Sequence, residues 1–174
     1  MGILAKRAEK QIGPSRNFVE KGELPMLLAL ASSLDEPWIR QLLTLCGLPH
    51  EDLTLEHLQH FWVIKEKGEI LGTVGLEIFG RSALLRSLAV DPGFRKRGFA
   101  SELAKRAEEN AASREVGDLY LLTMTAESFF RKRGYQKIER ISAPPEIQGT
   151  TEFKNLCPAS SVCMVKRLAL RPSL

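Results

Sequence analysis

The chain has 174 residues and a formal net charge of +4, with 44% hydrophobic and 26% charged residues. These values suit one globular domain with a full core, and the mild positive charge suits an anionic ligand without indicating nucleic acid. No apolar run is long enough to span a membrane, and the start lacks the apolar stretch of a secretory signal, so a cytoplasmic location is expected. Three cysteines, Cys46, Cys157 and Cys163, do not make a disulfide framework.

The first 24 residues are polar and basic, and they predict an N-terminal arm ahead of a single domain over residues 25–174. Apolar periodicity and turn residues predict the elements of the first half of that domain. These are a strand over 26–31, helices over 33–45 and 54–60, and a hairpin of strands over 61–67 and 69–79. Ser33 and Thr54 are residue types that cap helices, and Lys67-Gly68 suits the hairpin turn.

The second half alternates strands and helices. Its predicted elements are a strand over 82–90, a helix over 97–115, a strand over 118–123, a helix over 126–133, a strand over 135–141, a helical connection over 144–153 and a strand over 161–168. One face of the longest helix carries apolar residues at every fourth position: Phe99, Leu103, Ala107 and Ala111. A hairpin followed by strand–helix–strand crossovers predicts an α/β fold, with a mixed central sheet flanked by helices.

Residues 84–100, LLRSLAVDPGFRKRGFA, are the most informative stretch of the chain. An apolar strand runs into a turn at 91–93, and a glycine-bearing loop then opens a helix. The start of a helix has free backbone N–H groups and a positive dipole end, so it attracts phosphate. Gly98 and Ala100 leave room for a ligand at the backbone, and the cations at 95–97 add positive charge. The pattern therefore predicts a pyrophosphate site at the end of this strand.

The same stretch resembles the acyl-CoA-binding signature of the GNAT superfamily of N-acetyltransferases, R/Q-x-x-G-x-G/A, filled here by Arg95, Gly98 and Ala100. LAVDP at 88–92 is similar to the strand end that precedes this loop in the family, and AESFFRKRGY at 126–135 resembles a late family helix. The resemblance implies the GNAT fold, whose mixed sheet splays open beside the central strand where CoA enters. It also implies acetyl-CoA as the cosubstrate.

The resemblance further implies which residues contact the cofactor. They lie at the end of the central strand, in the following loop and helix start, and at two later positions: Leu88, Ala89, Val90, Arg95, Lys96, Arg97, Gly98, Phe99, Ala100, Thr123 and Phe130. Backbone groups near Leu88 and Val90 would polarise the acetyl carbonyl.

Two positions depart from the catalytic pattern of the family. Leu84 stands where many members have a strand glutamate, and Phe130 stands where they have a tyrosine that protonates the sulfur. Tyr135, five positions later, is expected to be too far away to replace that tyrosine. Thr125 lies at a strand end near the expected thioester, where its hydroxyl would relay a proton, and helix capping is the alternative for it and for Thr123.

Two charged residues in otherwise apolar strands are candidates for catalysis. Glu77 is the remaining candidate for a base, with an exposed position on a half-buried sheet as the alternative. Arg86 is costly to bury without a partner. Facing the cleft, its guanidinium would hold a substrate carboxylate or an oxyanion, and a structural pair with Glu77 is the alternative.

Three blocks resemble the ArsN-type branch of GNAT proteins, which is associated with arsenic resistance: residues 84–90, 121–127 and 152–160. The branch implies a small molecule or an arsenical as acceptor. Cys157 and Cys163 lack the spacing of a zinc site, so no metal site is expected. Their use as ligands for trivalent arsenic is a minor alternative to ordinary packing.

The basic stretches FRKRGF at 94–99 and FRKRGY at 130–135 raise the alternative of RNA binding. No aromatic stacking platform accompanies them, so no nucleic-acid or membrane partner is expected. We expect an N-acetyltransferase that passes the acetyl group of acetyl-CoA directly to a small, amine-bearing and anionic substrate. A CoA-binding or arsenical-sensing module without turnover is the alternative, and the oligomeric state stays open, a homodimer included.

Overall fold

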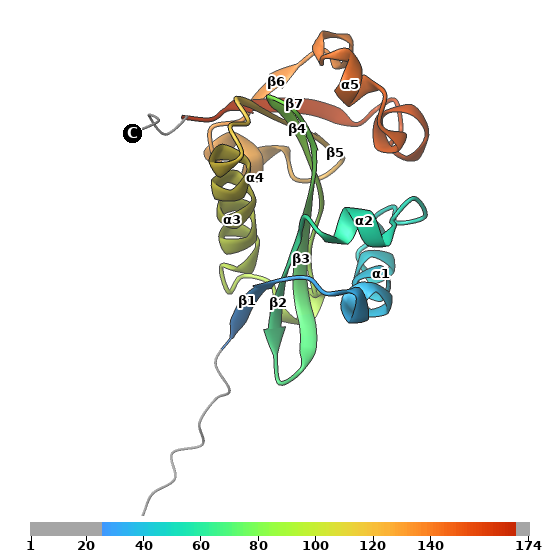
Figure 1. Ribbon diagram of the computed structural model, residues 1–174, viewed down its shortest axis with the longest axis vertical. Coiled ribbons are helices and arrows are strands. Elements are labelled where there is room, and N and C mark those ends of the chain that lie inside the picture. Colours follow the sequence, from blue (N-terminus) through green and yellow to red (C-terminus); the bar gives the residue numbers. More distant parts are fainter. Residues whose placement is uncertain (1–25, 170–174) are drawn as a thin grey trace, which may run out of the picture.

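The computed structural model describes residues 26–169, so the arm predicted over 1–24 lies outside the described residues. Its centre is a seven-stranded sheet in the order β1-β2-β3-β4-β5-β7-β6 (Figure 1). The strands are β1 Leu27–Leu30, β2 Phe61–Glu66, β3 Glu69–Phe79, β4 Ser82–Val90, β5 Asp118–Thr123, β6 Gln136–Ile138 and β7 Val162–Arg167. Only β4 and β5 pair in parallel, and the other neighbours are antiparallel. The predicted mixed sheet is confirmed.

Helices cover both faces of this sheet, with α3 on one side and α1 and α2 on the other (Figure 1). The α-helices are α1 Glu36–Leu45, α2 Leu55–Leu58, α3 Phe99–Ser113, α4 Glu127–Lys132 and α5 Pro145–Gln148. Shorter turns are the 3-10 helices η1 Ser33–Asp35, η2 Pro92–Phe94 and η3 Arg140–Ser142, and the π-helical turn η4 Glu152–Leu156. The predicted apolar face of α3 is confirmed, because all four of its residues are buried in the core against the sheet.

The structure confirms one predicted helix cap, shifts another by one residue and shortens one predicted strand. Thr54 caps α2 as predicted, and its side chain accepts a hydrogen bond from the His57 N–H. The helix predicted from Ser33 starts with η1, and its N-cap residue is Ser32 rather than Ser33, with contacts to the carboxylate of Asp35 at 2.8 and 3.0 Å. The strand predicted over 135–141 is shorter than expected, since η3 replaces its second half.

The sheet opens in its middle because β4 and β5 pair over only three positions. Ser82 to Leu84 lie opposite Asp118 to Tyr120, and the register ends there. On its other side β4 contains a bulge: Arg86 pairs with Gly75 and Ala89 pairs with Thr73, so three steps along β4 match two along β3. Ser87 lies in this bulge with φ +56°, a left-handed conformation that is uncommon for a serine. The bend and the short pairing leave a cleft beside β4.

Candidate active site

A cleft of about 670 Å³ opens where β4 and β5 separate. Its walls are β4, the end of β5 with the start of α4, the loop after α1, and the turn η4 with the chain that follows it. Five of the residues predicted for catalysis or cofactor binding line it: Arg86, Leu88, Thr123, Thr125 and Phe130. Ala89 and Val90 are buried at the end of β4, next to these residues but not in the wall.

The predicted phosphate-binding loop lies between η2 and α3. Arg95, Lys96, Arg97 and Gly98 are exposed, whereas Phe99 is buried and Ala100 is half-buried. Lys96 and Gly98 have φ of +64° and +83°, and Gly98 is the N-cap residue of the 15-residue helix α3. A Cβ atom at Gly98 would meet no atom within 4 Å, so there is open space next to the backbone here. The loop therefore presents backbone N–H groups and positive charge to solvent at the start of a long helix.

Side chains tie this loop to the neighbouring elements. Arg95 donates from Nε to the Val90 carbonyl at 3.2 Å, and its Nη2 contacts the Cys46 sulfur at 3.8 Å. Cys46 belongs to the cleft wall, so the loop adjoins the cleft at this point. Arg97 pairs with Glu66 at 3.2 Å and lies over the ring of Phe99.

Arg86 is the centre of a buried charge cluster at the base of the cleft, which we call the Arg86 cluster: Arg86, Asp52, Glu77 and Glu152. The Arg86 side chain has no exposed surface. Its terminal nitrogens donate to both carboxylate oxygens of Asp52 and to Glu77, each at 2.6 Å. Its Nε lies 3.6 Å from a carboxylate oxygen of Glu152. One guanidinium thus faces three carboxylates from three other elements.

This arrangement corrects the prediction that Arg86 holds a carboxylate of the substrate. The guanidinium is already engaged by Asp52 and Glu77, so the structural pair with Glu77, which was the alternative, is the one present. The carboxylate contacts also raise the pKa of Arg86 above its ordinary value despite burial. Arg86 is therefore a fixed cation inside the protein.

Glu77, which was predicted as the catalytic base, is also engaged by Arg86. Its side chain is 12% exposed and lies outside the cleft wall, with one oxygen bonded to Arg86 and the other 4.0 Å from Nε2 of His57. A carboxylate that is paired with Arg86 and absent from the cleft wall is poorly placed to accept a proton from a molecule in the cleft. Neither predicted environment, an open base or an exposed face residue, describes it.

Sequence reasoning missed Glu152 and Asp52. Glu152 is the first residue of η4, it lines the cleft, and its side chain is only 7% exposed. Burial raises the pKa of Glu152 to about 7, because the attraction of Arg86 does not offset desolvation and the nearby Glu77 and Asp52. The Asp52 carboxyl shows the opposite result: despite partial burial, its hydrogen bonds to Arg86 hold its pKa below the ordinary value. The one signal in the sequence was Arg86 itself, which required acidic partners.

The two threonines at the end of β5 differ. The Thr123 hydroxyl accepts a hydrogen bond from the Ala126 N–H at 2.9 Å, which is the capping role given as the alternative. Thr125 is exposed and lines the cleft. Of the two, Thr125 keeps a hydroxyl available to a bound molecule.

Tyr135 lies behind Phe130, in the core between α3 and β7. It is 2% exposed, its ring meets that of Phe130 edge-on with centroids 5.2 Å apart, and its hydroxyl lies 3.3 Å from a carboxylate oxygen of Glu108. Burial and Glu108 raise its pKa well above the ordinary value. It is not part of the cleft wall.

Cys157 and Cys163 add little chemistry to the site. Burial raises the pKa of Cys157 and of Cys163 to about 11, so both are thiols at neutral pH. Within residues 26–169, no group of three or more His, Cys, Asp or Glu side chains is arranged to hold a metal ion. In the same range no helix is long and apolar enough to cross a bilayer.

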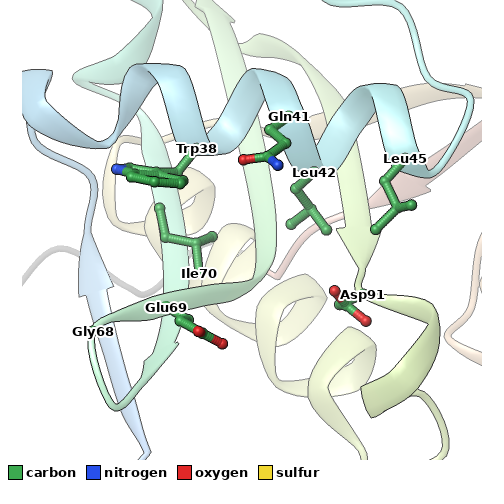
Figure 2. Close-up of a pocket in the computed structure, with 8 residues that line it drawn as sticks. All are labelled: Trp38, Gln41, Leu42, Leu45, Gly68, Glu69, Ile70 and Asp91. Carbon is green, nitrogen blue, oxygen red and sulfur yellow. The ribbon is translucent and has the colours of Figure 1, made fainter.

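A second, smaller pocket of about 300 Å³ lies between α1 and the turn of the β2–β3 hairpin (Figure 2). Figure 2 shows Trp38 and Leu42 of α1 above Ile70 and Glu69 of the hairpin, with Asp91 at the other end. None of the residues predicted for catalysis or cofactor binding lines it. The large cleft is therefore the candidate active site.

Comparison with known proteins identifies relatives of this chain. Residues 57–137 match the model of the acetyltransferase (GNAT) domain. An uncharacterized N-acetyltransferase of Chlorobaculum tepidum is 30% identical over 116 residues, which are 66% of this chain and 74% of that protein. The amino-acid acetyltransferase of Pseudomonas aeruginosa is 32% identical over 90 residues, which are 49% of this chain but 21% of that protein.

Among solved structures, N-acetylglutamate synthase of Neisseria gonorrhoeae, complexed with coenzyme A and N-acetyl-glutamate, has a TM-score of 0.73. The identity is 22%, and the alignment covers 84% of this chain and 36% of that one. This chain thus corresponds to one part of the two longer proteins. The likeness confirms the predicted fold, a mixed sheet flanked by helices, which in this structure has seven strands and opens between β4 and β5.

Proposed function

Because this chain belongs to the GNAT acetyltransferase family, we propose that it transfers the acetyl group of acetyl-CoA directly to the amine of a small molecule. The observation that carries the proposal is the cleft between β4 and β5, with the loop of α3 beside it. A helix N-terminus with exposed cations suits the pyrophosphate of CoA, and the cleft beside β4 suits its extended arm. Solved relatives of the same fold hold coenzyme A.

Different parts of the cleft would bind the cofactor and stabilise the reacting groups. Backbone N–H groups at residues 95–100 would bind the pyrophosphate, aided by the three cations of the loop. The bulge at Ser87 turns the backbone of β4 near Leu88, where main-chain donors would polarise the acetyl carbonyl. Thr125, exposed in the cleft, would pass a proton to the departing sulfur through water. Positioning the two reactants supplies most of the remaining rate enhancement.

The acceptor is proposed as a small amine. The sequence predicted an anionic acceptor held by Arg86, but Arg86 is engaged by carboxylates, so it gives no reason for an acidic substrate. What supports an amino acid is the similarity to an amino-acid acetyltransferase and to a synthase with bound N-acetyl-glutamate. The acceptors to be tested therefore include acidic, neutral and basic amines.

The link to arsenic rests on the ArsN-type resemblance of residues 84–90, 121–127 and 152–160. It would enter through an arsenic-containing amine as acceptor. Direct binding of trivalent arsenic by Cys157 and Cys163 is the weaker form of the proposal, because thiols with a pKa of about 11 carry little thiolate at neutral pH. The cytoplasmic location and the oligomeric state are further predictions, for cell fractionation and light scattering to decide.

Turnover tests the proposal. The purified protein is incubated with acetyl-CoA and with L-glutamate, glycinamide, ethylenediamine or an arsenic-containing amino acid. Release of the CoA thiol, together with an acetylated product in the mass spectrum, is the expected result for at least one amine. Binding of CoA in a calorimeter with no turnover of any amine would instead favour a CoA-binding module.

A further inference from the structure

Glu152 owes its place in the cleft to an unusual turn of the backbone. It opens the π-helical turn η4, a form that is rare and often found at functional sites. The turn is fixed at both ends: the Thr150 hydroxyl accepts from the Phe153 N–H at 3.3 Å, and the Glu152 carbonyl accepts from the Cys157 N–H at 3.0 Å. These contacts hold the Glu152 side chain against β4, where it lines the cleft.

Glu152 is also the least compensated acid of the Arg86 cluster. Asp52 receives two hydrogen bonds of 2.6 Å from Arg86 and Glu77 receives one, whereas the nearest contact of Glu152 is 3.6 Å, too long for a hydrogen bond. Among the hydrogen bonds within residues 26–169, none reaches its carboxylate. A buried acid without a donor is costly, and a cationic amine entering the cleft would supply that donor.

We propose that Glu152 is the catalytic base of the transfer, taking a proton from the acceptor amine; this inference rests on the proposed function. The ammonium group of the acceptor gives one proton to the Glu152 carboxylate. The free amine attacks the thioester carbon, the C–N bond forms, and the C–S bond then breaks. The second nitrogen proton goes to the CoA thiolate, and Glu152 returns its proton to solvent. The products are the acetamide, CoA thiol and one proton.

The charges around Glu152 suit this role. Arg86 on β4, Glu77 on β3 and Asp52 in the loop before α2 face it, and the Cys157 thiol lies beyond the other end of η4. Burial is the largest effect against the charged form of Glu152. Arg86 favours that form, whereas Glu77 and Asp52 oppose it as like charges. A pKa of about 7 lets the carboxylate accept a proton and release it again at neutral pH.

The test compares Glu152→Gln with Glu146→Gln, which removes an exposed acid of α5 outside the cleft. With the best amine of the panel, we expect Glu152→Gln to lower kcat at neutral pH by about 10²–10⁴-fold, the range for loss of a general base. The KM for acetyl-CoA and the affinity for CoA should stay unchanged, and Glu146→Gln should match the wild type. The fall of wild-type activity below a pH of about 7 should be absent in Glu152→Gln.

Two results would overturn the inference. One is an active Glu152→Gln variant with the wild-type pH profile. The other is an infrared titration in which the carboxylic-acid band lost in Glu152→Gln titrates in the wild type within the ordinary range of a glutamate. Glu152→Asp keeps a carboxylate on a side chain that is one methylene shorter, so its kcat should lie above that of Glu152→Gln. This variant separates loss of the base from misfolding. A wild-type protein that acetylates no amine would defeat the proposed function itself.

Discussion

Arg86 and Asp52 are 34 residues apart in sequence and meet end to end, with each terminal nitrogen of the guanidinium bonded at 2.6 Å to a different carboxylate oxygen. This two-pronged pairing fixes both the distance and the plane of the two groups. It joins β4 to the loop before α2, so two walls of the cleft are held by one buried contact.

Arg86→Met is therefore expected to destabilise the protein rather than to weaken acceptor binding alone. The change leaves Asp52, Glu77 and Glu152 buried without their cation, and breaking such a cluster typically costs about 3–5 kcal/mol. Urea unfolding of the wild type and the variant measures the loss. Arg86→Lys keeps the charge but not the two-pronged geometry and should fall between them. A variant as stable as the wild type but with a raised KM for the acceptor would contradict this assignment.

Stability should also depend on pH through Glu152. Its pKa is about 7 in the folded state and 4.5 when unperturbed, so the folded protein holds this proton more tightly than the unfolded chain. The resulting contribution to the free energy of unfolding is complete below pH 4.5 and is lost as pH rises through about 7. The loss amounts to about 3–4 kcal/mol, since one pKa unit corresponds to about 1.4 kcal/mol.

The matched comparison for that prediction is again Glu152→Gln, which cannot titrate. His60 has a lowered pKa in the folded state, so it works in the opposite direction, and the difference between wild type and variant removes its contribution. Unfolding free energies at a series of pH values should show the wild type losing stability relative to Glu152→Gln as pH rises. Parallel curves would show that the Glu152 carboxyl titrates normally.

Gly98→Asp is expected to weaken CoA binding. Gly98 has φ +83° and caps α3 at the proposed pyrophosphate site, with open space above it, so an aspartate there would add negative charge facing the phosphates. Gly98→Ala introduces the same backbone strain without the charge and is the control. Calorimetry should give a Kd for Gly98→Asp about tenfold or more above that of Gly98→Ala, a difference of about 1.4 kcal/mol. Equal affinities of the two variants would place the pyrophosphate elsewhere.

Tyr135→Phe should retain kcat, because the phenol points to Glu108 in the core and is absent from the cleft wall. Glu108 keeps Arg133 and Lys166 as partners at 3.2 and 2.8 Å, so the lost hydrogen bond should cost only about 0.5–1.5 kcal/mol. Steady-state kinetics and thermal unfolding check both parts. A kcat lowered by about 10²-fold or more, in the range for a lost general acid, would make Tyr135 that acid.

The sequence predicted what depends on local pattern. The apolar face of α3, the Thr54 cap and the loop at Gly98 each follow from residues within one or two turns of one another. The conformation of the loop and helix start that we propose as the cofactor site was therefore predictable in outline.

The acidic side of the cleft was not predictable, because it depends on long-range contacts. Asp52 reaches Arg86 from a loop, and Glu152 does so from a segment that the sequence predicted only as a helical connection. A π-helical turn has no recognisable apolar period, so the direction of the Glu152 side chain could not be inferred. A buried Arg86 indicated that acidic partners were needed, but Glu77 was the one partner that the sequence analysis identified.

The three-position pairing of β4 with β5 would also determine how the cleft binds an extended molecule. Beyond Leu84, within residues 26–169, the register with β5 ends, and the main-chain groups on that edge of β4 are left to water or to an occupant. An occupant with its own amide groups would continue the sheet there as a surrogate strand. Hydrogen bonds to the main chain do not depend on side-chain identity. The side chains of β4 along the cleft can therefore change during evolution while binding of the occupant persists.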